Sequence, residues 1–396
     1  MALETKKTES IVMINLVKMK KNTHIKVLFV LGFCLQILAQ ISFSFTDTFN
    51  LLEPIDFIHW TLLIGYVLII PGVLHFSKGK FSKVGVPITM AGIMASIGMC
   101  TIDFVLWSFN SNLEERANMY YHLVAEPAIW PVFISVGPTL LFVGLSIQSF
   151  DYINTNLKGM FITLFGSITT GIGGLLLPQE YHAVMLIGYI VFVIGLFILF
   201  LPKKQENTKH NKLYDYLFLT GILFEVIGQL LFVLVSVYDL KPIDFAHWSL
   251  FLGVAFAIPK MVNFPKGIIT YIGTPIAMAG AICILGMCLL DFIWWSQPNQ
   301  EIRNEFASHL SQFPSIWDVF IKKGTGYFNI GLFILSLNYL RQNKLGVLVI
   351  LIATLFIFGI IPIPYKMIIG YLTTLIGFGL LFFTKTTINE HKDKQI

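Results

Sequence analysis

Long apolar runs separated by short polar segments recur along almost the whole chain of 396 residues. The runs are continuous and do not alternate in polarity, which favours membrane-spanning helices over the strands of a barrel. Because a helix needs about 20 apolar residues to cross a bilayer, the pattern predicts an all-α integral membrane protein with about twelve transmembrane helices. The predicted spans are 25–45, 60–76, 84–107, 128–150, 158–178, 182–201, 214–238, 246–264, 268–295, 316–337, 344–362 and 367–384.

The composition supports a chain that is largely embedded in lipid. Hydrophobic residues make up 56% of it and charged residues only 12%, against about 25% charged in soluble domains. No nucleotide, haem or flavin signature occurs, which excludes ATP-driven transport within this chain and leaves any cofactor unknown. The cysteines all lie inside predicted spans and are interpreted as small apolar residues, without a disulfide framework or zinc ribbon. They are Cys34, Cys100, Cys283 and Cys288.

The net charge of +5 is distributed unevenly between alternate loops. With twelve spans, the basic clusters all fall on one side, which the positive-inside rule assigns to the cytoplasm together with both termini. We therefore interpret the basic residues as a topology signal and not as a nucleic-acid surface. They are Lys18, Lys20, Lys21, Lys26, Lys78, Lys80, Lys83, Lys203, Lys204, Lys209, Lys212, Lys260, Lys266, Arg341, Lys344, Lys385, Lys392 and Lys394.

Two heptapeptides of the chain differ at a single position: PIDFIHW at 54–60 and PIDFAHW at 242–248. Roughly half of the next fifty-odd positions after residues 54 and 242 also match without a gap, which predicts a tandem duplication. Six spans per copy would give parallel repeats related by a pseudo-two-fold axis along the membrane normal. Segment 26–40 resembles a signal peptide, but its counterpart at 217–229 indicates that it is retained. The predicted divisions are a cytoplasmic tail 1–24, a first repeat 25–201, a cytoplasmic linker 202–213, a second repeat 214–384 and a cytoplasmic tail 385–396.

Both predicted repeats place polar residues near the extracytoplasmic face. A carboxylate inside a span, as at Asp103 or Asp291, is costly and usually faces a partner or a water-filled cavity. Beside an imidazole, such a carboxylate could shuttle protons, bind a cation or orient a metal ligand. The predicted clusters are Gln40, Asp56, His59, Asp103 and His122 in the first repeat, and Gln229, Asp244, His247, Asp291 and His309 in the second.

Simpler roles compete with these chemical ones. Asp56 and Asp244 each precede a predicted helix, where a carboxylate can cap free N–H groups. His59, His122, His247 and His309 are weak metal-ligand candidates, because no HxxxH or HxxE spacing supports a site. The tryptophans suit either an interfacial aromatic belt or the lining of a pocket for a lipid-like substrate. They are Trp60, Trp107, Trp130, Trp248, Trp295 and Trp317.

The two predicted repeats differ most where Gln36 corresponds to Glu225, and Ser135-Val136 to Lys322-Lys323. A single charge in hydrocarbon costs several kcal/mol. We therefore expect Glu225 to pair with Lys322 or Lys323, as part of an ion- or substrate-coupling site. The alternative is that the tenth helix begins near residue 324 and leaves both lysines at the membrane surface.

Three functions remain open from the sequence. The first is a transporter or permease for a small solute or ion, with Asp103, Asp291 and the Glu225/lysine pair as coupling groups. The second is an integral-membrane enzyme that uses an outward-facing His/Asp site, with or without a metal, on a lipid-like substrate. The third is a non-catalytic scaffold or sensor. The layout is similar to that of major-facilitator transporters, but their charged loop motif is absent from SKGKFSK at 77–83. Beyond the bilayer, the partner expected is a small solute, ion or lipid-like molecule and not a nucleic acid, with the oligomeric state open.

Overall fold

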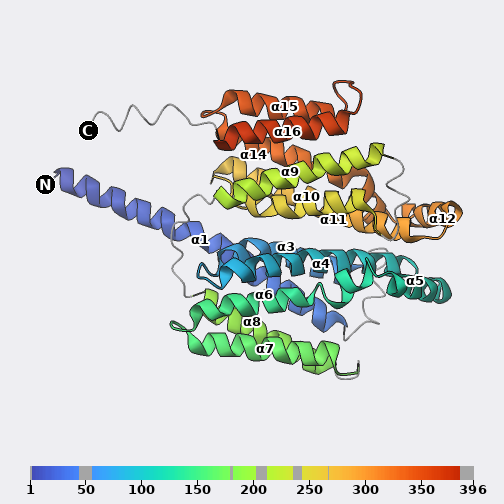
Figure 1. Ribbon diagram of the computed structural model, residues 1–396. Helices are drawn as coiled ribbons and strands as arrows, with labels where there is room; N and C mark the ends of the chain where they lie inside the picture. Colours follow the sequence, from blue (N-terminus) through green and yellow to red (C-terminus); the bar gives the residue numbers. More distant parts are fainter. Residues whose placement is uncertain are drawn as a thin grey trace. The chain divides into compact units, whose positions relative to one another are not determined.

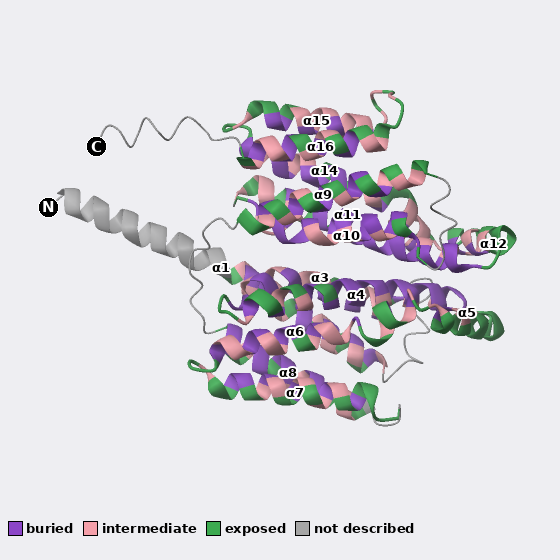
Figure 2. Ribbon diagram, in the orientation of Figure 1, coloured by how far each residue is buried: buried purple, intermediate pink, exposed green. Residues whose placement is uncertain are grey.

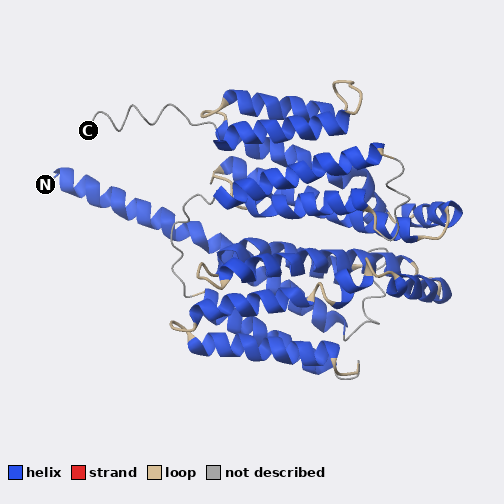
Figure 3. Cartoon of the chain, in the orientation of Figure 1, coloured by secondary structure: helices blue, strands red, loops and turns tan. Residues whose placement is uncertain are grey.

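A computed structural model of the chain describes residues 2–43, 56–178, 182–201, 212–234, 243–265 and 267–383, with the side chains of the first helix from residue 23 onward. The secondary structure of these residues is helical, and no strand occurs among them (Figure 3). The continuous apolar runs of the sequence therefore predict the all-helical class correctly.

Seven helices of the described residues are long and apolar enough to cross a membrane. This finding indicates a multi-pass membrane protein, as the hydrophobic pattern predicts. The predicted number of about twelve spans is not reached by the same criterion. The seven helices are α1 (Ala2–Phe43, apolar from Thr23), α3 (Phe57–Phe76), α4 (Ser82–Ser108), α8 (His182–Phe200), α9 (Lys212–Val233), α11 (Ile268–Ser296) and α16 (Lys366–Phe383).

Three of the other predicted spans form single helices that are shorter or less apolar than expected. These are α7 (Leu157–Leu175), α10 (Phe245–Met261) and α15 (Lys344–Ile357). The 14 residues of α15 extend about 21 Å at 1.5 Å per residue, which is less than a hydrocarbon core of about 30 Å. In α7, threonines and glycines interrupt the apolar sequence.

The two remaining predicted spans, 128–150 and 316–337, are interrupted by π-helical turns. In the first, the π-helix η2 (Pro131–Ser135) precedes α6 (Thr139–Ser149). Pro138 has no N–H to continue the hydrogen-bond ladder across this junction. In the second, α13 (Pro314–Ile316), the π-helix η6 (Trp317–Lys323) and α14 (Gly324–Ser336) follow one another.

Two segments expected to be outer loops are helices instead, α5 (Leu113–Ala125) and α12 (Gln300–Ser311). Asn112 caps the first by accepting a hydrogen bond from the N–H of Glu115, and Asn299 caps the second in the same way. Acidic residues in the first turn favour the helix further through its dipole. These capping signals are present in the sequence, although both segments contain too few apolar residues to be predicted as membrane spans.

The chain divides into two compact units. Unit 1 comprises residues 1–103 and 131–207, and unit 2 comprises 104–130 and 208–396. Within unit 1, α1 packs along α3 and α8, and α7 packs along α8 (Figure 1). Within unit 2, α9 packs along α10 and α16, α11 along α14, and α15 along α16. The predicted domain boundaries at the linker stay predictions.

Small residues allow the closest helix contacts inside each unit. In unit 1, a side chain at Gly92 would collide with the backbone of Leu141 in α6. In unit 2, a side chain at Gly280 would collide with the backbone of Phe328 in α14. Such close backbone approach is the usual basis of helix association in lipid. Of the seven long helices, α4 and α11 have the largest share of buried residues (Figure 2).

A buried ion pair holds α9 against α10 in unit 2. The Nζ atom of Lys260 lies 2.5 Å from Oδ1 of Asp215, and the two side chains are 2% and 1% exposed. The Lys260 ammonium also lies 4.6 Å from the ring centre of Phe382. Lys260, which the sequence analysis counts among the basic topology residues, is therefore paired inside the unit and is not an exposed cation.

We expect Lys260→Met to destabilise the protein by about 3–5 kcal/mol, because it leaves Asp215 as a buried charge without its partner. Asp215→Asn combined with Lys260→Met should restore most of the loss, since both charges are then absent. Unfolding of the purified variants in detergent micelles measures the difference. Equal stability of Lys260→Met and the wild-type protein would contradict the pairing.

Candidate functional site

Asp56 and Asp244 begin their helices by accepting backbone hydrogen bonds. The carboxylate of Asp56 accepts the N–H of His59 at 3.0 Å, at the start of α3. That of Asp244 accepts the N–H groups of Ala246 and His247 at 3.0 and 3.1 Å, at the start of α10. The predicted capping role is confirmed at both positions. Since a side chain bonded in this way is fixed to the first helical turn, it also fixes whatever the remaining oxygen contacts.

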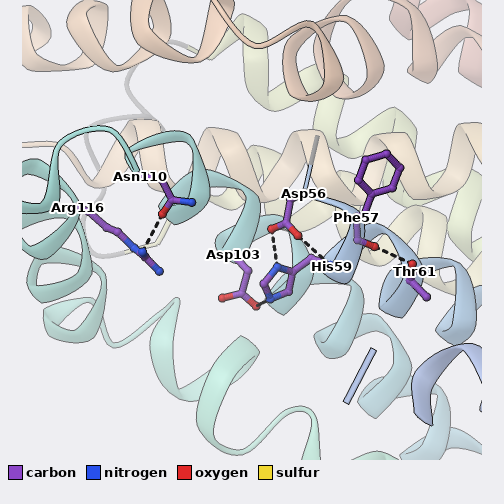
Figure 4. Close-up of polar contacts among 7 residues, drawn as sticks. All are labelled: Asp56, Phe57, His59, Thr61, Asp103, Asn110 and Arg116. Atoms are coloured by element: carbon purple, nitrogen blue, oxygen red, sulfur yellow. Dashed lines mark hydrogen bonds and ion pairs between the residues drawn. The ribbon is translucent and has the colours of Figure 1, made fainter. Parts of the chain in front are cut away.

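In unit 1, His59 bridges two carboxylates that come from different segments. Its Nδ1 atom lies 2.5 Å from Oδ2 of Asp56, and its Nε2 atom lies 3.2 Å from Oδ2 of Asp103 near the end of α4 (Figure 4). The side chains of Asp56 and His59 are 7% and 18% exposed, whereas that of Asp103 is 26% exposed. The predicted proximity of these three residues is therefore present in the structure.

Unit 2 contains the same arrangement with equivalent residues. His247 contacts Oδ2 of Asp244 through Nδ1, and its Nε2 atom lies 2.9 Å from Oδ2 of Asp291 near the end of α11. Asp244 is almost fully buried, while the side chain of Asp291 is 28% exposed. We call each group an Asp–His–Asp cluster: Asp56, His59 and Asp103 in unit 1, and Asp244, His247 and Asp291 in unit 2.

The geometry determines how many protons each cluster holds. Each nitrogen–oxygen contact needs one hydrogen, so the two contacts of an imidazole require two protons in the cluster. An imidazolium between two carboxylates satisfies this requirement, and so does a neutral imidazole with one protonated carboxyl group. Either distribution leaves a net charge of −1. Asp103 and Asp291 are the more exposed members, so they are the groups that can accept a further proton or a cation.

The same contacts limit the chemistry of His59 and His247. A histidine that acts as a general base or metal ligand needs one ring nitrogen free for the substrate or metal. Both nitrogens of each bridging ring are engaged by carboxylates. Among the described residues, no group of three or more His, Cys, Asp or Glu side chains has a metal-binding arrangement. While both contacts are made, neither bridging ring therefore offers a nitrogen to a substrate or a metal.

Asp291 also faces a cavity inside unit 2. This cavity has a volume of about 240 Å³ and is open on one side. Trp294, Phe306 and Trp317 supply aromatic walls, and Asp291 is the one carboxylate in the lining. Trp317 is a predicted lining residue, whereas Trp294 and Phe306 are absent from the sequence-based candidates. Their only signal in the sequence is a departure from the first repeat, which has leucine and methionine at the matching positions.

His122 and His309 form hydrogen bonds with serines and not with members of the Asp–His–Asp clusters. The Nε2 atom of His122 lies 2.8 Å from Oγ of Ser296, and that of His309 lies 3.0 Å from Oγ of Ser108. Each serine donates its own hydrogen to a backbone carbonyl three residues earlier. The histidines therefore donate from Nε2 to the serine oxygens, which fixes their tautomer. These reciprocal bonds join the ends of α4 and α11 to α12 and α5, and do not add imidazoles to an Asp–His–Asp cluster.

The expected ion pair of Glu225 with Lys322 or Lys323 does not form. Both lysines pair instead with Asp318, at 3.2 and 3.3 Å, on an exposed part of η6. Glu225 is 1% exposed in the middle of α9, and its Oε1 atom has no hydrogen-bond partner. The local pairing is favoured because Asp318 lies only four or five residues from the lysines, where the helix brings the side chains together.

The other predicted residues occupy less polar surroundings. Gln40 and Gln229 are half-buried, and no hydrogen bond joins either to a cluster within the described part of the chain. Three of the six predicted tryptophans pack on neighbouring aromatic rings, as Trp248 does on Phe292 at a centroid distance of 4.7 Å. The further ring pairs are Trp107 with Phe313 and Trp130 with Tyr120, while Trp60 and Trp295 are half-buried and buried respectively.

We expect acid to weaken the serine–histidine contacts. Burial lowers the pKa of His122 and of His309 below the ordinary value, although Glu126 and Glu115 respectively oppose the shift. Because an unfolded histidine has a pKa near 6.5, the contribution to stability is complete above that pH and is lost as pH falls through the folded values. Hydrogen exchange of peptides from 104–130, compared between pH 7.5 and pH 5 after correction for intrinsic rates, should show faster opening in acid.

The double variant His122→Gln with His309→Gln should lose most of this acid-dependent opening. His75→Gln, which lies outside these contacts, serves as the matched control and should retain it. An unchanged pH dependence in the double variant would contradict the role of the two histidines.

Family models, curated proteins and solved structures provide no match to this chain. The geometry of the described residues is therefore the sole basis for a functional conclusion.

Proposed function

We propose that this multi-pass membrane protein is a permease that exchanges protons for a cationic solute, with the two Asp–His–Asp clusters as its coupling sites. The observation that carries the proposal is the bridging imidazole, which leaves each cluster with a net charge of −1 and a partly exposed carboxylate. A charge of this kind within a membrane-spanning helix is costly and is expected at an ion or substrate pathway. A proton and a cation can then compete for the same carboxylate.

Each member of a cluster has a distinct part in such an exchange. The capping aspartate, Asp56 or Asp244, holds the imidazole through Nδ1 and is itself bonded to the helix N-terminus. The imidazole orients the outer carboxylate and shares a proton with it through Nε2. The outer carboxylate, Asp103 or Asp291, binds the exchanged proton or cation. Loss of the proton increases the negative charge that attracts the cation, which couples the two occupants electrostatically.

Glu225 supplies a second, deeper acid in unit 2. An unpaired carboxylate in apolar surroundings costs several kcal/mol, so the side chain is expected to be a neutral acid that holds a proton. The corresponding Gln36 of unit 1 accepts a hydrogen bond from Tyr189 at 2.5 Å and has no acid. We propose that Glu225 is a proton-binding group of the coupling machinery, whereas Lys322 and Lys323 are surface residues outside it.

We further propose twelve membrane segments in two parallel repeats, with both termini in the cytoplasm and the clusters near the opposite face. Three observations support this arrangement. Helices occupy all the places where spans are predicted. The helix pairs α1–α3, α1–α8 and α7–α8 of unit 1 have counterparts in α9–α10, α9–α16 and α15–α16 of unit 2. The positive charges of the loops follow the same alternation, even after Lys260 is removed from the count.

An enzyme remains the second candidate function. Its support is the cavity beside Asp291, whose aromatic walls could hold a lipid-like substrate next to a carboxylic acid. Against it, neither bridging histidine has a nitrogen available for a substrate, so general-base catalysis would require a cluster contact to break.

Proteoliposomes that contain a pH-sensitive dye test the exchange directly. We expect external Na⁺, K⁺ or choline to drive proton release through the wild-type protein, and expect Asp103→Asn and Asp291→Asn to slow it at least tenfold because each removes the exchanging carboxylate. Glu114→Gln changes an exposed carboxylate on α5 and is the matched control with an unchanged rate. Absence of cation-driven proton movement, or full activity in both cluster variants, would overturn the proposed function.

The protonated state of Glu225 has an independent test. Dicyclohexylcarbodiimide reacts with protonated carboxyl groups in apolar surroundings, so mass spectrometry of labelled protein should find the adduct at Glu225. Asp215 is equally buried but ion-paired with Lys260, and it should stay unlabelled as the control within the same chain. Labelling of Asp215 without Glu225 would contradict the assignment.

A further inference from the structure

The cavity beside Asp291 combines one carboxylate with an otherwise apolar and aromatic lining. Besides the three aromatic residues, its walls are formed by Leu290, Ala307, Leu310 and Ile321. We propose that this cavity binds a small alkylammonium cation, with choline as the representative ligand. The inference rests on the proposed function, because it names the class of solute that the permease would exchange for protons.

Charge complementarity provides the first argument. Asp291 presents a carboxylate to the cavity while its Oδ2 atom contacts Nε2 of His247 at 2.9 Å. The whole cluster has a net charge of −1, and burial of Asp244 and His247 leaves Asp291 as its most exposed member. A monovalent cation in the cavity would therefore neutralise the cluster without adding a second positive charge. In surroundings of low polarity this attraction is stronger than it would be in water.

The chemistry of the walls distinguishes an organic cation from a metal ion. Ca²⁺ is bound in proteins by about six to eight oxygen ligands, and Asp291 is the one lining side chain with a carboxylate or carbonyl oxygen. Trp294, Trp317 and Phe306 present aromatic rings instead, and rings of this kind attract quaternary ammonium groups through their negative faces. The volume of about 240 Å³ is smaller than that of drug-sized pockets, about 300–1,000 Å³, and favours a compact ligand.

Two of the three aromatic walls occur in one repeat of the sequence only, whereas Trp317 corresponds to Trp130 of the first repeat. Trp294 corresponds to Leu106 of the first repeat, and Phe306 corresponds to Met119. We therefore expect a single such site per chain. Arg303 acts against a cation, since its guanidinium lies 5.4 Å from the ring centre of Trp294. It is held by hydrogen bonds to the backbone carbonyls of Trp295 and Gln297, so it cannot fold into the cavity without losing both.

Calorimetric titration of the full-length protein in maltoside micelles tests this site without measuring transport. Choline should bind with one site per chain, and its uncharged isostere 3,3-dimethylbutan-1-ol at least tenfold more weakly. Asp291→Asn should weaken choline binding at least tenfold. Trp294→Leu, which introduces the residue of the first repeat, should weaken it about 2- to 30-fold, the range expected for one cation–π contact. Asp318→Asn removes a carboxylate of η6 that does not line the cavity. It is the matched control and should leave the affinity for choline unchanged.

Two sources of the ammonium group are distinguished by lipid composition. Weaker choline binding in phosphatidylcholine nanodiscs than in phosphatidylglycerol nanodiscs assigns the site to a lipid headgroup, and equal binding assigns it to a soluble cation. The inference is overturned if choline does not bind, if the isostere binds equally well, or if Asp291→Asn and Trp294→Leu both bind like the wild-type protein while they remain folded. Because binding is measured separately from proton exchange, either proposal can fail while the other stands.

Discussion

An ionisable side chain among apolar helices must find a partner, because an unpaired charge removed from water costs several kcal/mol. The chain meets this requirement in different ways at different places. Lys260 and Asp215 neutralise each other, whereas the carboxylates of the clusters share a histidine. Only the pair of Lys260 and Asp215 is electrically neutral. Each Asp–His–Asp cluster keeps a net charge of −1, which can attract a further proton or a cation.

Each cluster is also part of the framework that supports it. Asp56 and Asp244 use one carboxylate oxygen for the helix N-terminus and the other for the imidazole. The position of the histidine therefore depends on the cap, and the position of the outer carboxylate depends on the histidine. Asp103 and Asp291 belong to α4 and α11. Under the proposed function, a change in the occupancy of either carboxylate would therefore act directly on one of these two helices.

The two units carry the same cluster in different surroundings. Unit 2 adds an aromatic cavity beside Asp291 and a buried acid at Glu225. Unit 1 has a neutral hydrogen bond between Tyr189 and Gln36 at the place that corresponds to the acid. Under the proposed function, these differences give unit 2 the recognition of an organic solute and an additional proton-binding acid, while both clusters serve as coupling sites.

The sequence by itself determined the helical class, the membrane environment, the capping aspartates and the residue types of the clusters, because the length of apolar runs and cap chemistry are local properties. It could not show that π-helical turns occur in two of the predicted spans or that α15 ends after 14 residues, so the predicted number of spans is not confirmed. Only the tertiary structure decided which partners meet. It gave Lys322 and Lys323 to Asp318, Lys260 to Asp215, and the outer histidines to serines. Pairing depends on which helix faces come together, and residue spacing along one chain does not contain that information.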